Sequence, residues 1–206
     1  MIEIRTILIS ISLIGVIDCK MEPFVVGGKR ANINNFPHSA LLNVICIDVL
    51  SDVKVAWICG ASIVNDRVSL TAAHCVSRCN SSSLVFMSVG HSHNDEGAVS
   101  SVLSYYMHEH YRSTKFHYDI ALLKLKTPLK FNATVQRVAL MENPPYYEKA
   151  QIAGWGMINE ILDINAEQLY YTDQWVWRSA ECKKLIKSLP DGAICASSGD
   201  DSYPSL

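Results

Sequence analysis

A succession of short apolar segments limits the fold of this chain more than any other feature of its sequence. After residues 25–28, these segments are rich in Val, Ile, Leu and aromatic residues, and Gly, Asn, Asp and Ser separate them. They read SALLNVICIDV, AWICGASIV, VSLTAA, LVFMSVG, VSSVLSYYM, DIALLKL and AQIAGWG. Because β-branched and aromatic residues favour strands, regular spacing of such runs is typical of a barrel or sandwich. The sequence therefore predicts an all-β fold.

Two segments depart from this strand pattern. Residues 178–189 are predicted to form a helix, with Ser179 as a candidate N-cap. One face of this helix carries apolar residues at helical spacing, namely Cys182, Leu185, Ile186 and Leu189. Residues 127–140 are polar, contain a proline and suit a linker between two lobes. A chain of 206 residues is long enough for one large domain or two such lobes.

The first residues have the pattern of a secretory signal. Arg5 precedes an apolar run over residues 7–17, which is too short to span a bilayer but suits the core of a signal peptide. A buried first strand is the alternative, and we favour the signal. We therefore expect a signal peptide over residues 1–19 and a short propeptide over residues 20–24. No other segment approaches transmembrane length, so the sequence predicts a soluble extracellular protein without a membrane partner.

The cysteines and the glycosylation motifs agree with secretion. The chain contains seven cysteines, at positions 19, 46, 59, 75, 79, 182 and 195. Cys19 falls at the end of the expected signal, which leaves an even number, as disulfide pairing in an oxidising compartment requires. N-glycosylation motifs begin at Asn80 (NSS) and Asn132 (NAT). These features predict a secreted glycoprotein with disulfide bonds.

The net charge is close to zero, which bears on the choice of partners. The formal net charge is −2 and the pI is near 6.4. This balance gives no reason to expect nucleic acid or an anionic membrane surface as a partner.

The segment SLTAAHCV contains a histidine that is a candidate catalyst. His74 lies there among small residues and beside Cys75. A histidine that transfers protons in catalysis needs a carboxylate to orient its ring and a hydroxyl or thiol to activate. Asp119 begins the apolar segment DIALLKL and could be that carboxylate, although an aspartate at such a place is most often a turn or cap residue. These local patterns alone do not place Asp119 beside His74.

Several motifs in order give the chain a family resemblance. The chain contains the motifs TAAHC, DIALLKL, VVGG and GWG, and the supporting segments FPHSALL, CGASIV and LPDGAICA. These motifs resemble those of the secreted serine proteases of the chymotrypsin and trypsin type. The resemblance extends over residues 25–206, which it defines as a protease domain. It implies two antiparallel six-stranded β-barrels with the active site between them. It also implies that His74 is the general base, that Asp119 orients it, and that no cofactor or metal takes part.

The resemblance also implies the disulfide pairs. Cys59 with Cys75 and Cys182 with Cys195 follow the family pattern. Cys46 and Cys79 remain, and we expect them to pair between neighbouring loops on the rim of the cleft.

The mature N-terminus is expected at Val25, because VVGG matches the start of the mature family enzymes. The residue before the cut is Phe24 instead of the usual Arg or Lys, so we expect a chymotrypsin-like activating protease. Like other zymogens of the family, the mature enzyme is expected to be a monomer. Its expected partners are protein or peptide substrates and protease inhibitors.

The serine nucleophile of the family does not occur in the sequence. The family places it in GDSGGP, a little over ten residues beyond the cysteine that matches Cys195, whereas this chain reads CASSGDDSYPSL there. Ser62 and Ser69 occupy packing positions, and Ser202 lacks the glycines that follow the nucleophile and lies too close to Cys195. We therefore expect the second barrel to be incomplete and the 206 residues alone to be inactive.

Two hypotheses about function follow. The first is a secreted serine endopeptidase that hydrolyses peptide bonds with a Ser-His-Asp triad. The second is a non-catalytic homologue that acts as a secreted binding or decoy protein. His74 and Asp119 favour the first hypothesis, because a binding protein has no need of both.

Two His-x-His pairs are candidate metal ligands. They are His91 with His93 and His108 with His110, and in a strand each pair would share one face. No third ligand is evident at a fitting spacing, so we expect surface histidines and no metal. His117 is expected at the rim of the cleft.

Overall fold

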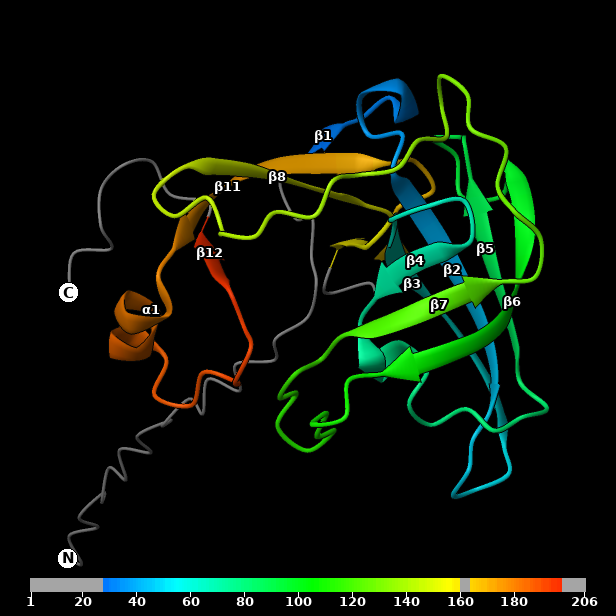
Figure 1. Ribbon diagram of the computed structural model, residues 1–206, viewed down its shortest axis with the longest axis horizontal. Coiled ribbons are helices and arrows are strands. Elements are labelled where there is room, and N and C mark those ends of the chain that lie inside the picture. Colours follow the sequence, from blue (N-terminus) through cyan, green and yellow to red (C-terminus); the bar gives the residue numbers. More distant parts are fainter. Residues whose placement is uncertain (1–27, 160–163, 198–206) are drawn as a thin grey trace, which may run out of the picture.

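The first half of the chain forms a closed barrel of six antiparallel strands. The computed structural model describes residues 28–159 and 164–197 (Figure 1). The barrel strands are β2 (Ser39–Ile47), β3 (Lys54–Ile63), β4 (Val68–Thr71), β5 (Leu84–Val89), β6 (Ala98–Met107) and β7 (Ala121–Leu125). They pair in the order β2-β3-β4-β7-β6-β5, and β2 closes the barrel by pairing with both β3 and β5. Closure leaves none of these strands at an open edge.

The interior of the barrel follows the alternation of the strands. In β7, Ala121, Leu123 and Leu125 are buried, whereas Leu122 and Lys124 face outward. Leu123 and Leu125 have no exposed surface, and the core includes other fully buried side chains such as Leu42, Ile63 and Met87. Burial of each such side chain contributes about 1.5–3 kcal/mol relative to leaving it in water. This core explains why the apolar segments of the sequence form these strands.

The second half, together with β1 from the start of the described chain, forms a four-stranded antiparallel sheet on the left of Figure 1. Its central strand β11 (Tyr170–Trp177) pairs with β8 (Lys149–Gly154), β1 (Lys29–Arg30) and β12 (Cys195–Ser197). A short pair is made by β9 (Met157–Asn159) and β10 (Ile164–Asn165). The all-β prediction is thus confirmed, as is one closed six-stranded barrel. The sheet is consistent with the predicted incomplete second barrel.

A second, smaller core lies where the two halves meet. It consists of buried residues from both, namely Ile33, Phe36, Leu41, Trp155 and Leu169. Leu41 belongs to barrel strand β2, and Ile33 begins the 3₁₀-helix η1 (Ile33–Asn35). The indole Nε1–H of Trp155 donates to the Ser92 carbonyl at 2.8 Å, and Ser92 lies in the loop between β5 and β6. The halves are therefore joined by packing and by hydrogen bonds.

The connection between the halves agrees with the predicted linker. Residues 126–148 lie between β7 and β8 and contain none of the helices or strands of the described chain. Leu129 and Val135 nevertheless pack against the barrel core. The linker therefore lies against the barrel that it leaves.

The helix is shorter than predicted. It is α1 (Ser179–Leu185), with Arg178 at the N-cap, so Ser179 is its first residue and not its cap. Ile186 has an extended backbone and is 43% exposed. The helix ends there because the chain must return to Cys195, only 13 residues beyond Cys182 and bonded to it. Among the described residues, no helix combines the length and apolar character needed to cross a membrane.

Candidate active site

The pairing of β4 with β7 brings His74 and Asp119 together. Thr71 at the end of β4 lies opposite Ala121 at the start of β7. Because the strands are antiparallel, the chain leaving β4 and the chain entering β7 lie at the same end of the barrel. His74 follows β4 in the 3₁₀-helix η2 (Ala73–Cys75), and Asp119 lies two positions before the start of β7. Long-range strand pairing therefore sets a contact between residues 45 positions apart.

Asp119 holds His74 at two points. Its Oδ2 lies 2.6 Å from Nδ1 of the imidazole, and its Oδ1 accepts the backbone N–H of His74 at 2.8 Å. The side chains are 20% exposed for Asp119 and 40% for His74. The two bonds fix both the ring and the turn that carries it, and the ring remains open to solvent.

These contacts determine which ring nitrogen can act as a base. An ionised carboxylate can only accept hydrogen bonds, so the bond to Asp119 requires a proton on Nδ1. In the neutral ring, Nε2 of His74 is then unprotonated and available to accept a proton. The same aspartate would stabilise the imidazolium that forms when Nε2 takes the proton. Such an arrangement is chemically able to accept a proton at Nε2.

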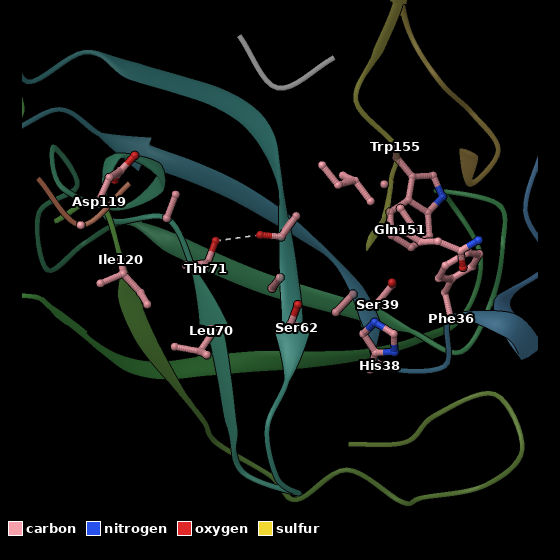
Figure 2. Close-up of a pocket in the computed structure, with 18 of the residues that line it drawn as sticks. Phe36, His38, Ser39, Ser62, Leu70, Thr71, Asp119, Ile120, Gln151 and Trp155 are labelled. Atoms are coloured by element: carbon pink, nitrogen blue, oxygen red, sulfur yellow. Dashed lines mark hydrogen bonds between the residues drawn. The ribbon is translucent and has the colours of Figure 1, made fainter. Parts of the chain in front are cut away.

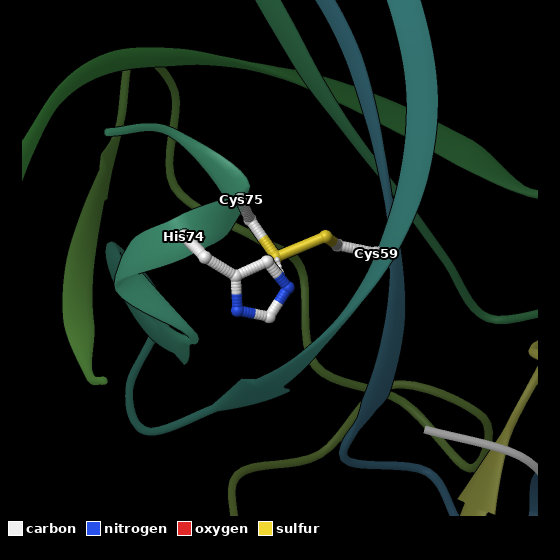
Figure 3. A group of neighbouring side chains, drawn as sticks. All are labelled: Cys59, His74 and Cys75. Carbon is white, nitrogen blue, oxygen red and sulfur yellow. Dashed lines mark hydrogen bonds between the residues drawn. A yellow bond between two sulfur atoms is a disulfide. The ribbon is translucent and has the colours of Figure 1, made fainter. Parts of the chain in front are cut away.

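A disulfide lies directly behind the histidine (Figure 3). Cys59 in β3 and Cys75 in η2 are bonded, and Cys75 Sγ lies 3.6 Å from His74 Nε2. These three side chains have the spacing of a metal cluster, but both sulfurs are in the disulfide and offer no thiolate. The disulfide therefore anchors the turn of His74 to β3 and does not form a metal site with it.

The segment before Asp119 is braced by the second half of the chain. The N–H of Tyr118 donates to the Asp191 carbonyl at 2.8 Å, and His117 Nδ1 lies 3.1 Å from Asp191 Oδ2. The rings of Phe116 and His74 meet in a T-shaped contact, with 5.9 Å between centroids. Phe116 and Asp191 could not be identified from the sequence, because no local pattern marks either of them. The contacts depend on loops that only the folded chain brings together.

A hollow of about 700 Å³ lies between the barrel and the second half (Figure 2). Asp119 and Ile120 line one end of it, and Phe36 and Trp155 line the other. The Thr71 hydroxyl on its wall donates to the Gly60 carbonyl at 2.8 Å. Asp119 thus faces a space shared by both halves, as expected for a carboxylate beside a cleft.

Neither Ser62 nor Ser69, the candidate nucleophiles among the described residues, is hydrogen-bonded to His74. Ser69 is fully buried and its hydroxyl has no hydrogen-bond partner, and Ser62 lines the hollow on β3. In residues 28–159 and 164–197, no serine hydroxyl is hydrogen-bonded to His74 Nε2. Ser202 lies outside the described residues. The described residues of the site therefore include the His74–Asp119 pair without a serine bonded to Nε2.

The remaining disulfides join Cys46 to Cys79 and Cys182 to Cys195. The expected loop position was wrong for Cys46, which lies within β2. Cys79 lies in the loop between η2 and β5, and both cysteines are buried in the barrel core. The pair is buried because Cys46 has the inward position in the alternation of β2.

The glycosylation motifs lie in turns. Asn80 Oδ1 accepts the Ser82 N–H at 2.9 Å, and Asn132 Oδ1 accepts the Thr134 N–H at 2.8 Å. Val25, and with it the expected signal and propeptide, lies outside the described residues.

A closed β-barrel with a His–Asp pair at its rim defines a protein of the chymotrypsin-like fold. The family model described as Trypsin matches residues 25–204, so the chain belongs to the trypsin family of serine proteases. The predicted resemblance is therefore confirmed.

Individual relatives agree with this assignment. Hypodermin-B of Hypoderma lineatum is 31% identical over 166 residues, which cover 80% of this chain and 61% of hypodermin-B. Trypsin delta of Drosophila erecta is 30% identical over 188 residues, with 88% and 71% covered. The chain thus spans less than two thirds of hypodermin-B. A crystal structure of a scabies mite inactivated protease paralogue matches with a TM-score of 0.73 and 21% identity, covering 84% and 74% of the chains, and supports the fold alone.

Proposed function

We propose that this chain belongs to a secreted serine endopeptidase in which His74 is the general base and Asp119 its orienting carboxylate. One observation carries the proposal, the two-point contact of Asp119 with the ring and the backbone of His74. A turn or cap aspartate needs only the backbone bond. The additional bond to Nδ1 leaves Nε2 as the basic nitrogen, which is what activation of a hydroxyl requires.

The proposed reaction is hydrolysis of a peptide bond through an acyl-enzyme. His74 Nε2 accepts the proton of a serine hydroxyl as the serine oxygen attacks the peptide carbonyl. It then gives that proton to the leaving amine, and a water molecule deacylates the enzyme by the same route. The family motif GDSGGP, which holds the serine and oxyanion-hole donors, does not occur in the 206 residues. We therefore propose the activity for a protein whose chain also carries that motif.

Secretion and processing are part of the proposal. Three disulfides and the apolar run of residues 7–17 support an extracellular location. We propose cleavage after Phe24 to give Val25 as the N-terminus, and glycosylation at Asn80 and Asn132. The proposed partners of the mature monomer are protein substrates and protease inhibitors. N-terminal sequencing of the secreted protein tests the cut, and a start at Lys20 would contradict it.

The activity can be tested with a fluorophosphonate probe, which labels an activated serine. The 206-residue chain is compared with the complete chain read from the transcript. We expect labelling of the complete chain alone, abolished by His74→Ala and slowed about 10⁴-fold by Asp119→Asn. His110→Ala is the matched control and should label normally.

Two results would contradict this proposal. A complete chain that contains a serine in GDSGGP but takes no label would favour the non-catalytic homologue. Labelling of the 206-residue chain at Ser202 would mean that the nucleophile lies elsewhere than proposed.

A further inference from the structure

An apolar stripe lies on the outer face of the barrel beside the glycosylation motif at Asn80. Buried and part-exposed residues alternate toward the end of β2, where Ile45 and Ile47 are on the outward side and Val49 continues the alternation. Leu84 at the start of β5 is paired with Ile45 and shares its face. Val49 is 60% exposed and Leu84 53%. These four apolar residues form the outer stripe.

Asn80 lies opposite the middle of the outer stripe. The segment that carries it runs antiparallel along the end of β2, where Cys79 and Asp48 form an isolated bridge. The N–H of Asn80 donates to the Ile47 carbonyl at 3.0 Å. Because residues directly opposite each other in an antiparallel pair share a face, Asn80 is on the outward face with Ile47. The buried Cys79 and Asp48 are on the inward face.

We propose that an N-linked glycan on Asn80 packs over the outer stripe and shields it from water. Asn80 Oδ1 accepts the Ser82 N–H at 2.9 Å, whereas no hydrogen bond between described residues uses Nδ2, the atom that would carry the sugar. The C–H faces of sugar rings are apolar and their rims carry hydroxyls, so a glycan can cover apolar side chains and stay hydrated. The inference rests on the proposed glycosylation of Asn80 and not on the protease activity.

The turn beyond the outer stripe is held in its exposed position. The buried carboxylate of Asp48 accepts the N–H groups of Leu50 and Ser51 at 2.9 and 3.0 Å. It also lies 2.6 Å from Nε of Arg78. Leu50 is 86% exposed in this turn. Since these bonds fix the chain directly after Val49, the barrel cannot bury that end of the stripe itself, and a cover must come from outside the barrel.

A glycan on Asn80 would begin within reach of the whole stripe. Residues that share a face of a strand are about 7 Å apart, so Ile45 and Val49 are each about 7 Å from Ile47. Because Asn80 is opposite Ile47, the first sugars need to extend only this far in either direction along β2. Lys54 on β3 is paired with Ile47 from the other side and gives the stripe a polar border.

The second glycosylation motif provides a matched control. Asn132 Oδ1 accepts the Thr134 N–H at 2.8 Å, the same local turn as at Asn80. A Cβ on Gly90 would lie 2.9 Å from Val135 Cγ2, so this motif packs just beyond the end of β5. Leu84 is at the start of β5, and the six residues of this strand span about 20 Å. A glycan on Asn132 would therefore begin far from the outer stripe.

The test compares chains secreted from eukaryotic cells, after mass spectrometry has measured the sugar on each asparagine. Ser82→Ala removes the motif at Asn80 and keeps the backbone N–H that Oδ1 accepts. Thr134→Ala removes the other motif in the same way. Ser82→Ala should raise binding of the apolar dye ANS about threefold and promote self-association, and Thr134→Ala should change neither. Ser82→Thr retains the motif and should match the unchanged chain.

A further variant links the dye to the outer stripe itself. Val49→Thr and Leu84→Thr, combined with Ser82→Ala, should return dye binding to the level of the glycosylated chain, because they remove its exposed apolar side chains. Both positions are largely exposed, so circular dichroism should show the variant folded.

Three results would overturn the proposal. Dye binding that Ser82→Ala leaves unchanged, although Asn80 carries sugar in the parent chain, would contradict this inference alone. Equal rises in Ser82→Ala and Thr134→Ala would indicate that sugars raise solubility in general and cover no particular surface. An Asn80 without sugar would contradict the proposed glycosylation as well, whereas the fluorophosphonate experiment would still test the proposed activity.

Discussion

The two halves of the molecule use the same kind of strand but differ in how they are completed. In the barrel, each strand pairs on both sides and encloses a core of 17 buried residues. In the part of the chain that the structure describes, the cluster where the halves meet holds five, of which two precede the barrel, one belongs to a barrel strand and two lie in the second half. Among the described residues, β8 pairs with β11 alone, so its other edge carries no strand. The comparison indicates that the barrel supplies most of the stability and that the sheet depends on it.

The same comparison explains where the site is positioned. His74 and Asp119 both lie at the end of the β4–β7 pair, inside the closed half. The positions of His74 and Asp119 are therefore set by a complete barrel. The second half contributes bracing contacts such as the Tyr118 bond to Asp191. The geometry of the pair should then tolerate changes in the sheet better than changes in the barrel.

The largest expected difference comes from equal truncations in the two cores. Leu123 and Leu169 are both fully buried, one in each cluster. Leu123→Ala should lower the free energy of unfolding by about 4 kcal/mol, because the closed barrel cannot collapse around the cavity. Leu169→Ala should cost about 3 kcal/mol or less, because the smaller cluster can relax. Urea unfolding measures both, and a larger loss for Leu169→Ala would reverse the ranking of the halves.

The next effect separates the disulfides. Replacement of both Cys59 and Cys75 by Ser should cost about 3 kcal/mol and disturb the turn of His74. Loss of the disulfide between Cys182 and Cys195 should have a similar chain-entropy cost. Its cysteines are 13 residues apart, and those of the first disulfide are 16 residues apart. The second double replacement should nevertheless leave the His74 ring signals in place. NMR of the histidine rings and urea unfolding check this, and movement of His74 in the second variant would couple its position to the sheet.

A smaller effect tests the junction of the halves. Trp155→Phe removes the hydrogen bond from the indole Nε1–H to the Ser92 carbonyl. This change should lower the free energy of unfolding by about 1 kcal/mol. Trp57→Phe removes a 3.2 Å bond to the Cys75 carbonyl within the barrel and is the matched control. It should cost about 0.5 kcal/mol, because this indole is only half-buried. Thermal unfolding measures both variants, and equal losses would argue against a special role of the junction.

The smallest effect is a pH dependence at the junction. Burial lowers the pKa of His38 below its usual 6.5, because desolvation disfavours the charged ring. The folded state then binds this proton more weakly than the unfolded chain does. The contribution of the neutral His38 ring to the free energy of unfolding is therefore complete above pH 6.5. It is lost as the pH falls from there through the pKa of His38 in the folded state. His38→Gln should flatten the stability profile in that window, and an unchanged profile would exclude His38 as its source.

Much of the barrel could be predicted because its strands carry local signals. Val, Ile and Leu runs such as that around Leu123 mark strands by composition and alternation. The predicted helix was too long because the return of the chain to Cys195, and not propensity, ends it. The disulfide of Cys46 and Cys79 lies in the core because Cys46 has an inward position in β2. We expected Cys46 in a loop and therefore did not predict this burial.

The candidate site was predictable only in part. The resemblance of the motifs predicted that His74 and Asp119 act together. The physical reason for their contact is the register of β4 on β7. Phe116 and Asp191 carry no comparable motif, and their places follow from loop packing.

The tautomer of His74 tests the central claim most directly. In ¹⁵N NMR of the 206-residue chain with neutral rings, we predict a proton on Nδ1 of His74 and none on Nε2. His91 is an internal comparison with the opposite tautomer, because its Nδ1 accepts a backbone N–H. Asp119→Asn should move the His74 proton to Nε2 and leave His91 unchanged. A wild-type His74 that carries its proton on Nε2, or that ignores Asp119→Asn, would contradict the account.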